Sequence, residues 1–150
     1  MTITKKQQLS FINQSKKQYK KLEKLCHNLW REIVFARANY KCEYLGCHRK
    51  ATQPHHIFTK GHSRHLRHDT SNGMALCYPH HKGSNEAAHC DISFKDKILG
   101  KNYGFTPIRT EQWFEILERK AAVPYKLDLF LEYNYLLNEA KKWKIEIHTK

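Results

Sequence analysis

Residues 54–81 read "PHHIFTKGHSRHLRHDTSNGMALCYPHH" and contain two pairs of adjacent histidines, His55 with His56 and His80 with His81. Neighbouring side chains on a strand point to opposite faces, so the two members of such a pair have different roles. The segments "TQPHHIF" and "GMALC" read as two short strands, and "PHHKGSNEAAH" reads as the start of a helix. The stretch therefore predicts a compact β-β-α unit.

Cysteine spacing predicts a metal site around this unit. Four residues separate Cys42 from Cys47 in "CEYLGC", and two separate Cys77 from His80 in "CYPH". Two chelating pairs from distant segments, with spacings in the range of structural zinc sites, predict a tetrahedral Cys3His zinc site. Gly46 is expected to provide the tight turn between the first two cysteines.

The termini and the cysteine content predict a cytoplasmic protein. The N-terminal stretch "MTITKKQQLSFINQSKK" lacks the apolar core and small-residue cleavage site of a secretory signal. No stretch has the apolar length that crosses a membrane. Cysteines in that compartment are metal ligands or free thiols more often than disulfides. Cys90 is an alternative fourth zinc ligand, and Cys26 is expected in the core.

The pattern along the chain predicts one α+β domain over residues 1–150. Residues 5–38 read as a long basic helix, residues 39–107 as a loop-rich metal-binding centre, and residues 108–145 as two C-terminal helices. Thr110 is expected to cap the first of these two helices, and Pro124 to lie in the first turn of the second. Two apolar faces at helical spacing support the assignment: Tyr19, Leu22, Cys26, Leu29 and Ile33 in the first helix, and Phe130, Tyr133, Leu137 and Ala140 in the last.

The charge of the chain indicates a polyanionic partner. The 27 Lys and Arg against 14 Asp and Glu give +13, and residues 1–50 alone carry +9. An excess of this size favours nucleic acid as the partner, with an anionic membrane second. The long first helix could also form a homodimer.

With its zinc pairs, the β-β-α stretch resembles the HNH endonucleases of the ββα-metal superfamily. It looks most like small phage-encoded members, some of which are associated with recombination. The family pattern has Asp or His followed by His on the first strand, Asn in the loop and His on the helix. The matching residues are His55, His56, Asn72 and His81, and the resemblance covers residues 42 to about 95. It implies a zinc-stapled HNH core flanked by helices.

The resemblance also implies roles for the matching residues. His55 and His81 would be ligands of a catalytic metal, and His56 would be the general base. Asn72 would hold the loop and orient His56, most simply through a backbone contact. His89 lies eight residues after His81, near two helical turns, and so returns to roughly the same face. It is expected to be a third metal ligand or a phosphate contact.

The sequence departs from the family pattern at two positions. Zinc-stapled members usually carry CxxC before the helical histidine, so His80 replaces a cysteine here. This leaves a rival register in which His81 binds the zinc and His80 the catalytic metal. His55 stands where many members have Asp, and a site of imidazoles favours Mn²⁺, Co²⁺, Ni²⁺ or Zn²⁺ over Mg²⁺ more than a carboxylate site would.

The function expected from these residues is metal-dependent hydrolysis of phosphodiester bonds in DNA. Water activated by His56 would attack phosphorus while the metal stabilises the developing charge. The resemblance implies 5′-phosphate and 3′-hydroxyl products, in bacterial or phage-infected cytoplasm. Two alternatives remain open: a non-catalytic zinc-dependent DNA-binding protein, and a structural or partner-binding protein.

Basic and histidine side chains outside the motif have simpler interpretations. Arg64 and Arg67, in the loop between the strands, are expected to clamp phosphate. Five lysines lie on one face of the first helix, opposite its apolar residues, and are expected to follow the DNA backbone: Lys16, Lys17, Lys20, Lys21 and Lys24. The other histidines are expected on the surface or in solvated loops: His27, His48, His62, His65, His68 and His148.

Overall fold

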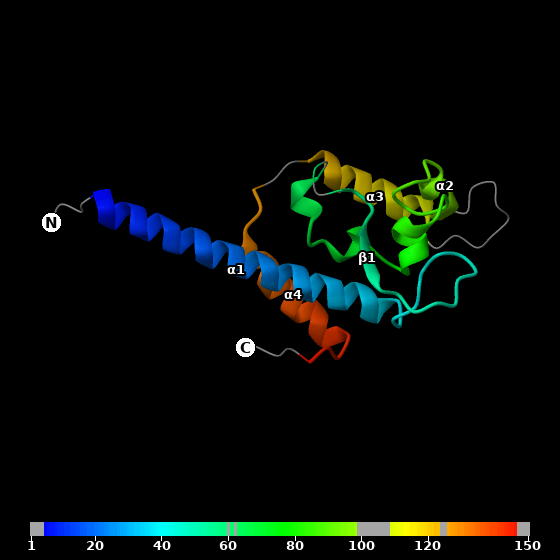
Figure 1. Cartoon of the computed structure of the whole chain (residues 1–150), viewed down its shortest axis with the longest axis horizontal. Coiled ribbons are helices and arrows are strands. Elements are labelled where there is room, and N and C mark those ends of the chain that lie inside the picture. The colour runs from blue at the N-terminus through cyan, green and yellow to red at the C-terminus, as the bar shows by residue number, and fades with distance from the viewer. Residues whose placement is uncertain (1–4, 60, 62, 99–108, 124–125, 147–150) are drawn as a thin grey trace.

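The computed structural model describes residues 5–59, 61, 63–98, 109–123 and 126–146. Its architecture is α+β: a long N-terminal helix, a two-stranded antiparallel hairpin, short helical turns and C-terminal helices (Figure 1). No helix in the described part of the chain is long and apolar enough to cross a membrane.

The first helix, α1 (Lys5–Arg37), matches the helix predicted over residues 5–38. Its apolar face is buried in its C-terminal half, where Cys26, Trp30 and Ile33 are almost inaccessible to solvent. Its N-terminal half projects beyond the other elements (Figure 1). Tyr19 is therefore 45% exposed although it continues the apolar repeat.

The hairpin consists of β1 (Gln53–His56) and β2 (Gly73–Leu76), in a register that pairs His56 with Gly73. Every residue of β2 is buried because the strand lies between two small cores. Ala75 packs into the core formed by α1 and the last helix, whereas Met74 and Leu76 pack into a second core around the cysteines. The period of two along a strand divides its side chains between these cores.

Gly73 is where β2 approaches α1 most closely, and it supports a prediction about stability. A Cβ atom at this position would lie 2.3 Å from Cγ2 of Val34 and 3.1 Å from the Trp30 ring. We expect Gly73→Ala to force β2 away from α1 and to lower the free energy of unfolding by about 1–3 kcal/mol. Urea unfolding measures this, with Gly61→Ala as control because no atom lies within 4 Å of a Cβ there. Equal stability of the two variants would show that the approach is looser than described.

The helix predicted to start at "PHHKGSNEAAH" is wrong in extent. A single π-helical turn, η3 (Pro79–Gly83), is followed by turns, and the next helix is the short α2 (Phe94–Ile98). Pro79 suits the first position of η3, but Ser84 is extended, with φ −148° and ψ 167°, and ends it. The Gly-Ser-Asn sequence at this point favours a break over a continued helix.

The C-terminal helices are α3 (Glu111–Ala122) and α4 (Leu129–Lys142). Thr110 caps α3 as predicted, accepting a hydrogen bond from the backbone N–H of Trp113. α4 begins later than predicted, because Asp128 caps it by accepting from two backbone N–H groups, and Pro124 lies outside the described residues. Phe130 is 65% exposed, so it is not on the buried face predicted for it. That face packs on α1 through Leu129, Leu136 and Ala140, with Tyr133 and Leu137 partly buried beside them.

Candidate metal centres

Cys42, Cys47, Cys77 and His80 form a group whose ligand atoms all lie within 4.8 Å of one another. Nδ1 of His80 is 3.3 Å from the sulfur of Cys77 and 3.5 Å from that of Cys42. The sulfurs of Cys47 and Cys77 are 3.9 Å apart. Zinc–sulfur bonds of about 2.3 Å and zinc–nitrogen bonds of about 2.0–2.1 Å in a tetrahedron leave about 3.8 Å between sulfurs and about 3.6 Å between sulfur and nitrogen. The group can therefore hold a zinc ion.

The surroundings of this group suit a structural site. Gly46 adopts φ +69°, the left-handed conformation that glycine takes readily, and so allows the predicted turn between two cysteines. The ring of Tyr44 stacks on that of His80, with centroids 3.9 Å apart and an interplanar angle of 16°. Burial raises the pKa of the Cys42 thiol to about 12, so zinc binding displaces a proton from it.

The two remaining cysteines lie outside the group. Cys90 is exposed, and it is not among the described residues that meet at either metal-binding group. Cys26 is buried on α1, where burial raises the pKa of its thiol to about 11 and its sulfur contacts the carbonyl of Leu129 at 3.6 Å. Cys26 is thus a core residue, as predicted.

A second group brings together His55 from β1, His81 from η3 and His89, again with ligand atoms within 4.8 Å of one another. The three rings stand nearly perpendicular, at interplanar angles of 75°, 86° and 84°. Nε2 of His81 is 3.1 Å from Nε2 of His89. Two nitrogens about 2.1 Å from one ion are about 3.0 Å apart at a right angle and about 3.4 Å apart at a tetrahedral angle. The spacing therefore fits two ligands of one ion.

The electrostatics of the second group also fit a metal. Burial, followed by repulsion from His89, lowers the pKa of His55 to about 3 and that of His81 to about 4. Both rings are therefore neutral at pH 7, which is the form that binds metals. Nδ1 of His55 is buried without a hydrogen-bond partner among the described residues. Buried polar atoms are normally satisfied, and an ion bound to this nitrogen would satisfy it.

The structure places His80 with the cysteines and His81 with the other histidines, and so separates the two members of the second pair. His89 lies beside His81 as predicted, but not through two turns of regular helix. The backbone N–H of His89 donates to the carbonyl of His81 at 3.3 Å, and that of Ala88 donates to the carbonyl of His80 at 2.8 Å. These bonds return the chain to the group after η3 has ended.

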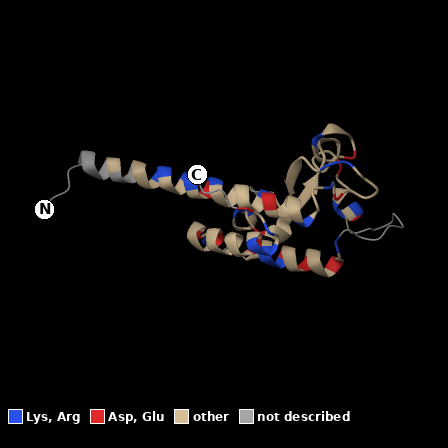
Figure 2. Ribbon diagram, turned by 90° about the horizontal axis from the view of Figure 1, so that it is seen from below, with Lys and Arg blue, Asp and Glu red and all other residues tan. Residues whose placement is uncertain are grey.

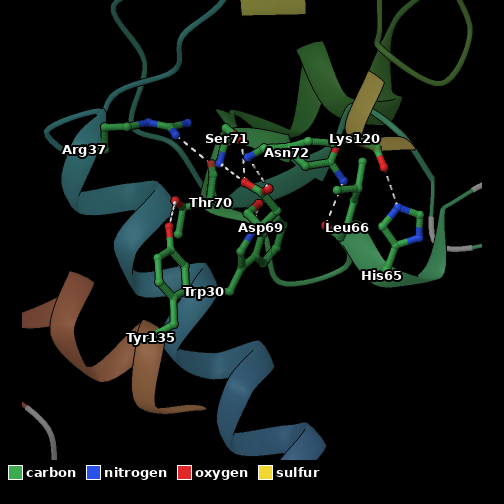
Figure 3. Close-up of polar contacts among 10 residues, drawn as sticks. All are labelled: Trp30, Arg37, His65, Leu66, Asp69, Thr70, Ser71, Asn72, Lys120 and Tyr135. Atoms are coloured by element: carbon green, nitrogen blue, oxygen red, sulfur yellow. Dashed lines mark hydrogen bonds and ion pairs between the residues drawn. The ribbon is translucent and has the colours of Figure 1, made fainter. Parts of the chain in front are cut away.

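His56 lies on the side of β1 that faces α1. Its ring stacks on the Trp30 ring, with centroids 4.0 Å apart and an interplanar angle of 10°. Its Nε2 is 2.8 Å from the backbone carbonyl of Arg67. Because a carbonyl only accepts, Nε2 carries the proton of this bond, and in the neutral ring Nδ1 is the basic nitrogen. Trp30 also donates from Nε1 to the carbonyl of Asp69 at 3.0 Å, which fixes the loop beside the ring (Figure 3).

Asn72 is fully buried and joins the end of β1 to this loop. Its amide oxygen accepts from the N–H of Phe58 at 2.7 Å. Its amide nitrogen donates to the carbonyls of Phe58 and Leu66, both at 3.0 Å (Figure 3 draws the second bond). Leu66 precedes Arg67, whose carbonyl holds His56. Asn72 thus holds the loop through backbone contacts, and its orienting effect on His56 stays a prediction.

Asn72→Ala is therefore expected to loosen the loop. The change removes three hydrogen bonds, two with the backbone of Phe58 and one with the carbonyl of Leu66, each worth about 0.5–1.5 kcal/mol. We expect a fall of about 2–3 kcal/mol in unfolding free energy, measured by urea titration, together with slower DNA cleavage. The exposed Asn85 provides a control as Asn85→Ala. Unchanged stability of the Asn72 variant would contradict the described role.

The predicted phosphate contacts occupy different surroundings. Arg64 is exposed in η1 (Arg64–Leu66), whereas Arg67 is partly buried and forms an ion pair with Glu23 of α1. Basic residues follow α1 in Figure 2, and five lysines are exposed on it, as predicted: Lys16, Lys17, Lys20, Lys21 and Lys24. Their contact with DNA remains a prediction.

Two loop histidines are buried, against the expectation that they are solvated. His65 donates from Nε2 to a backbone carbonyl of α3 at 2.7 Å, and His68 is fully buried. His48 is exposed as expected. The predictions for His62 and His148 fall outside the described residues.

Sequence reasoning missed the aromatic residues that support the histidines. Trp30 follows Cys26 by four residues on the apolar face of α1, which is a signal for burial but not for contact with His56. Tyr44 lies between two cysteines, and nothing in the spacing shows that it stacks on His80. His27, expected on the surface, is partly buried and stacks on Trp30 at 5.5 Å.

No family model, curated protein or solved structure matches this chain.

Proposed function

We propose that this protein is a metal-dependent endonuclease with an HNH-type ββα-metal core that hydrolyses phosphodiester bonds in DNA. The observation that carries the proposal is the three-histidine group, which is separate from the Cys3His group and shares β1 with His56. A structural zinc site accounts for the cysteines and His80 alone. A second group of three imidazoles lies next in sequence to a histidine held by the loop. Metal-dependent hydrolysis requires such a group, and folding does not.

His56 is the proposed general base. The bond from its Nε2 to the carbonyl of Arg67 fixes the tautomer, and stacking on Trp30 fixes the ring plane. Nδ1 is then the atom that removes a proton from the attacking water. Histidine suits this task because its usual pKa lies near neutral pH.

His55, His81 and His89 would hold the catalytic divalent ion, and Cys42, Cys47, Cys77 and His80 the structural zinc. The catalytic ion would supply Lewis-acid stabilisation of the negative charge that develops on the phosphate. Three nitrogen ligands favour Mn²⁺, Co²⁺, Ni²⁺ or Zn²⁺ over Mg²⁺. The residues of the chain fix the ligand geometry and exclude part of the solvent, since His55 and His81 are buried.

The substrate side of the proposal depends on charge. The net charge of +13 and the exposed lysines of α1 favour a polyanionic strand. One such centre cuts one strand, so nicking is the expected reaction, and double-strand cleavage would need a homodimer or two visits. The chain is proposed to act in the cytoplasm and not on a membrane.

Incubation of the purified zinc-loaded protein with supercoiled plasmid tests the proposal. Nicked plasmid is expected with Mn²⁺ and not without added divalent metal. Single-stranded, duplex and branched DNA in parallel would identify the preferred substrate. Salt-sensitive DNA binding without cleavage, under every metal tried, would favour the non-catalytic zinc-dependent DNA-binding protein instead.

A further inference from the structure

A cleft of about 210 Å³ lies between α1 and the segment that follows η1. Its lining residues are three permanently positive side chains, one carboxylate and two histidines: Lys20, Lys24, Arg67, Glu23, His27 and His68. Small-molecule pockets usually measure about 300–1,000 Å³, so this cleft suits a group the size of a phosphate with part of its sugar. Its charge suits an anion.

The cleft adjoins the proposed base. The rings of His27 and His56 are 6.2 Å apart and nearly parallel, and those of His27 and His68 are 6.4 Å apart. Arg67 contributes its side chain to the cleft and its backbone carbonyl to the bond with His56. A group bound in the cleft would therefore lie beside Arg67, the residue whose carbonyl holds the proposed base.

Glu23 and Arg67 form an ion pair inside this cleft, with side chains 29% and 19% exposed. Guanidinium groups bind carboxylate and phosphate through the same pairs of N–H donors. Glu23 is the only acid among the described residues that line the cleft, so its carboxylate is the group that an incoming phosphate would displace.

We propose that this cleft binds a backbone phosphate of the nucleic acid strand beside the one that is cut, and that Glu23 occupies the place of this phosphate in the free protein. The identity of the ligand as nucleic acid rests on the proposed function. Lys20 and Lys24 contact the phosphate from α1, and Arg67 contacts it from the loop. Lys17 and Lys21 are exposed on the same helix but are not among the described lining residues.

Two double variants of equal charge test the cleft. Binding of a fluorescein-labelled 20-base-pair DNA duplex is measured by anisotropy across a salt series, with no divalent metal added. Each phosphate contact contributes about −0.9 to the slope of log affinity against log salt, so Lys20→Gln with Lys24→Gln should flatten the slope by up to about 1.8. Lys41→Gln with Lys50→Gln, at two exposed lysines that belong neither to the cleft nor to the lysine face of α1, should leave the slope nearly unchanged. Equal losses in the two variants, or no binding by the unaltered protein, would overturn the proposal.

A gain of binding provides the second test, because misfolding does not produce one. Glu23→Gln frees Arg67 and should tighten DNA binding about two- to fivefold. Glu32→Gln, also on α1, removes the same charge outside the cleft and serves as the control. Equal tightening by both changes would show a net-charge effect and overturn the subsite. These measurements do not depend on cleavage, so a protein that binds through the cleft but never cuts would refute only the nuclease function.

Discussion

His56→Ala is expected to reduce plasmid nicking by about 10²–10⁴-fold, the usual cost of losing a general base. The zinc content should be unchanged, because His56 lies outside both metal-binding groups. The nicking rate is measured in Mn²⁺ on supercoiled plasmid, and zinc is measured on the same sample. Stacking on Trp30 is also lost, so the melting temperature is recorded with each rate.

His48→Ala is the matched control, since His48 is exposed and belongs to neither group. It should cut at the wild-type rate. A His56 variant that keeps its fold and nicks at close to the wild-type rate would place the base elsewhere. His55 would then be the first residue to examine.

Cys77→Ser is expected to release the zinc and to unfold the centre of the molecule. Zinc binding in small structural sites is coupled to about 10–16 kcal/mol of folding free energy. The core around the site consists largely of residues from the loop-rich centre, including Met74, Leu76 and Phe94, so few other contacts hold it. Metal analysis should show about one tightly held zinc in the wild type and none in the variant.

The helices α1 and α4 have a separate core, so part of the helical circular dichroism should survive in the Cys77 variant. Cys90→Ser is the control, because Cys90 is exposed and outside the group. It should keep both the zinc and the melting temperature. A Cys77 variant that also keeps both would refute the Cys3His assignment.

The helices could be predicted largely from local signals. The apolar spacing of α1 and the cap at Thr110 are properties of nearby residues, and both predictions are confirmed. The sequence predicts too early a start for α4. Proline is common in the first turn of a helix, but it is equally compatible with the chain before a helix, so Pro124 does not mark the start. The capping side chain of Asp128 decides the boundary, and caps compete locally with other starts.

Most members of the metal-binding groups could be predicted from the sequence, but the division of His80 and His81 between the groups and the path of the chain between them could not. Cysteine spacing indicated the first group because chelating pairs have narrow spacing limits. His80 and His81 are adjacent and chemically alike, so only the geometry of η3 distinguishes them. His89 was expected beside His81 through helix periodicity, whereas turns bring it there.

The surroundings of His56 depend on contacts between distant segments. Trp30 and Arg67 lie 26 residues before and 11 residues after it in the chain, and no spacing rule joins them. His65 and His68 lie in a polar loop, which predicts that they are solvated. Packing against α3 and α1 buries them instead. Tertiary packing overrides local polarity in such loops, and one sequence alone carries no signal for it.

The central claim is that the three-histidine group is a second metal site on which cleavage depends. The most direct test titrates Mn²⁺ into the zinc-loaded protein and follows, in the same samples, bound Mn²⁺ by electron paramagnetic resonance and the plasmid-nicking rate. We predict about one Mn²⁺ bound per chain beyond the zinc, a nicking rate that rises with its occupancy, and loss of both in His81→Ala but not in His48→Ala. Nicking by His81→Ala at the wild-type rate, or nicking by the wild type without bound Mn²⁺, would contradict the claim.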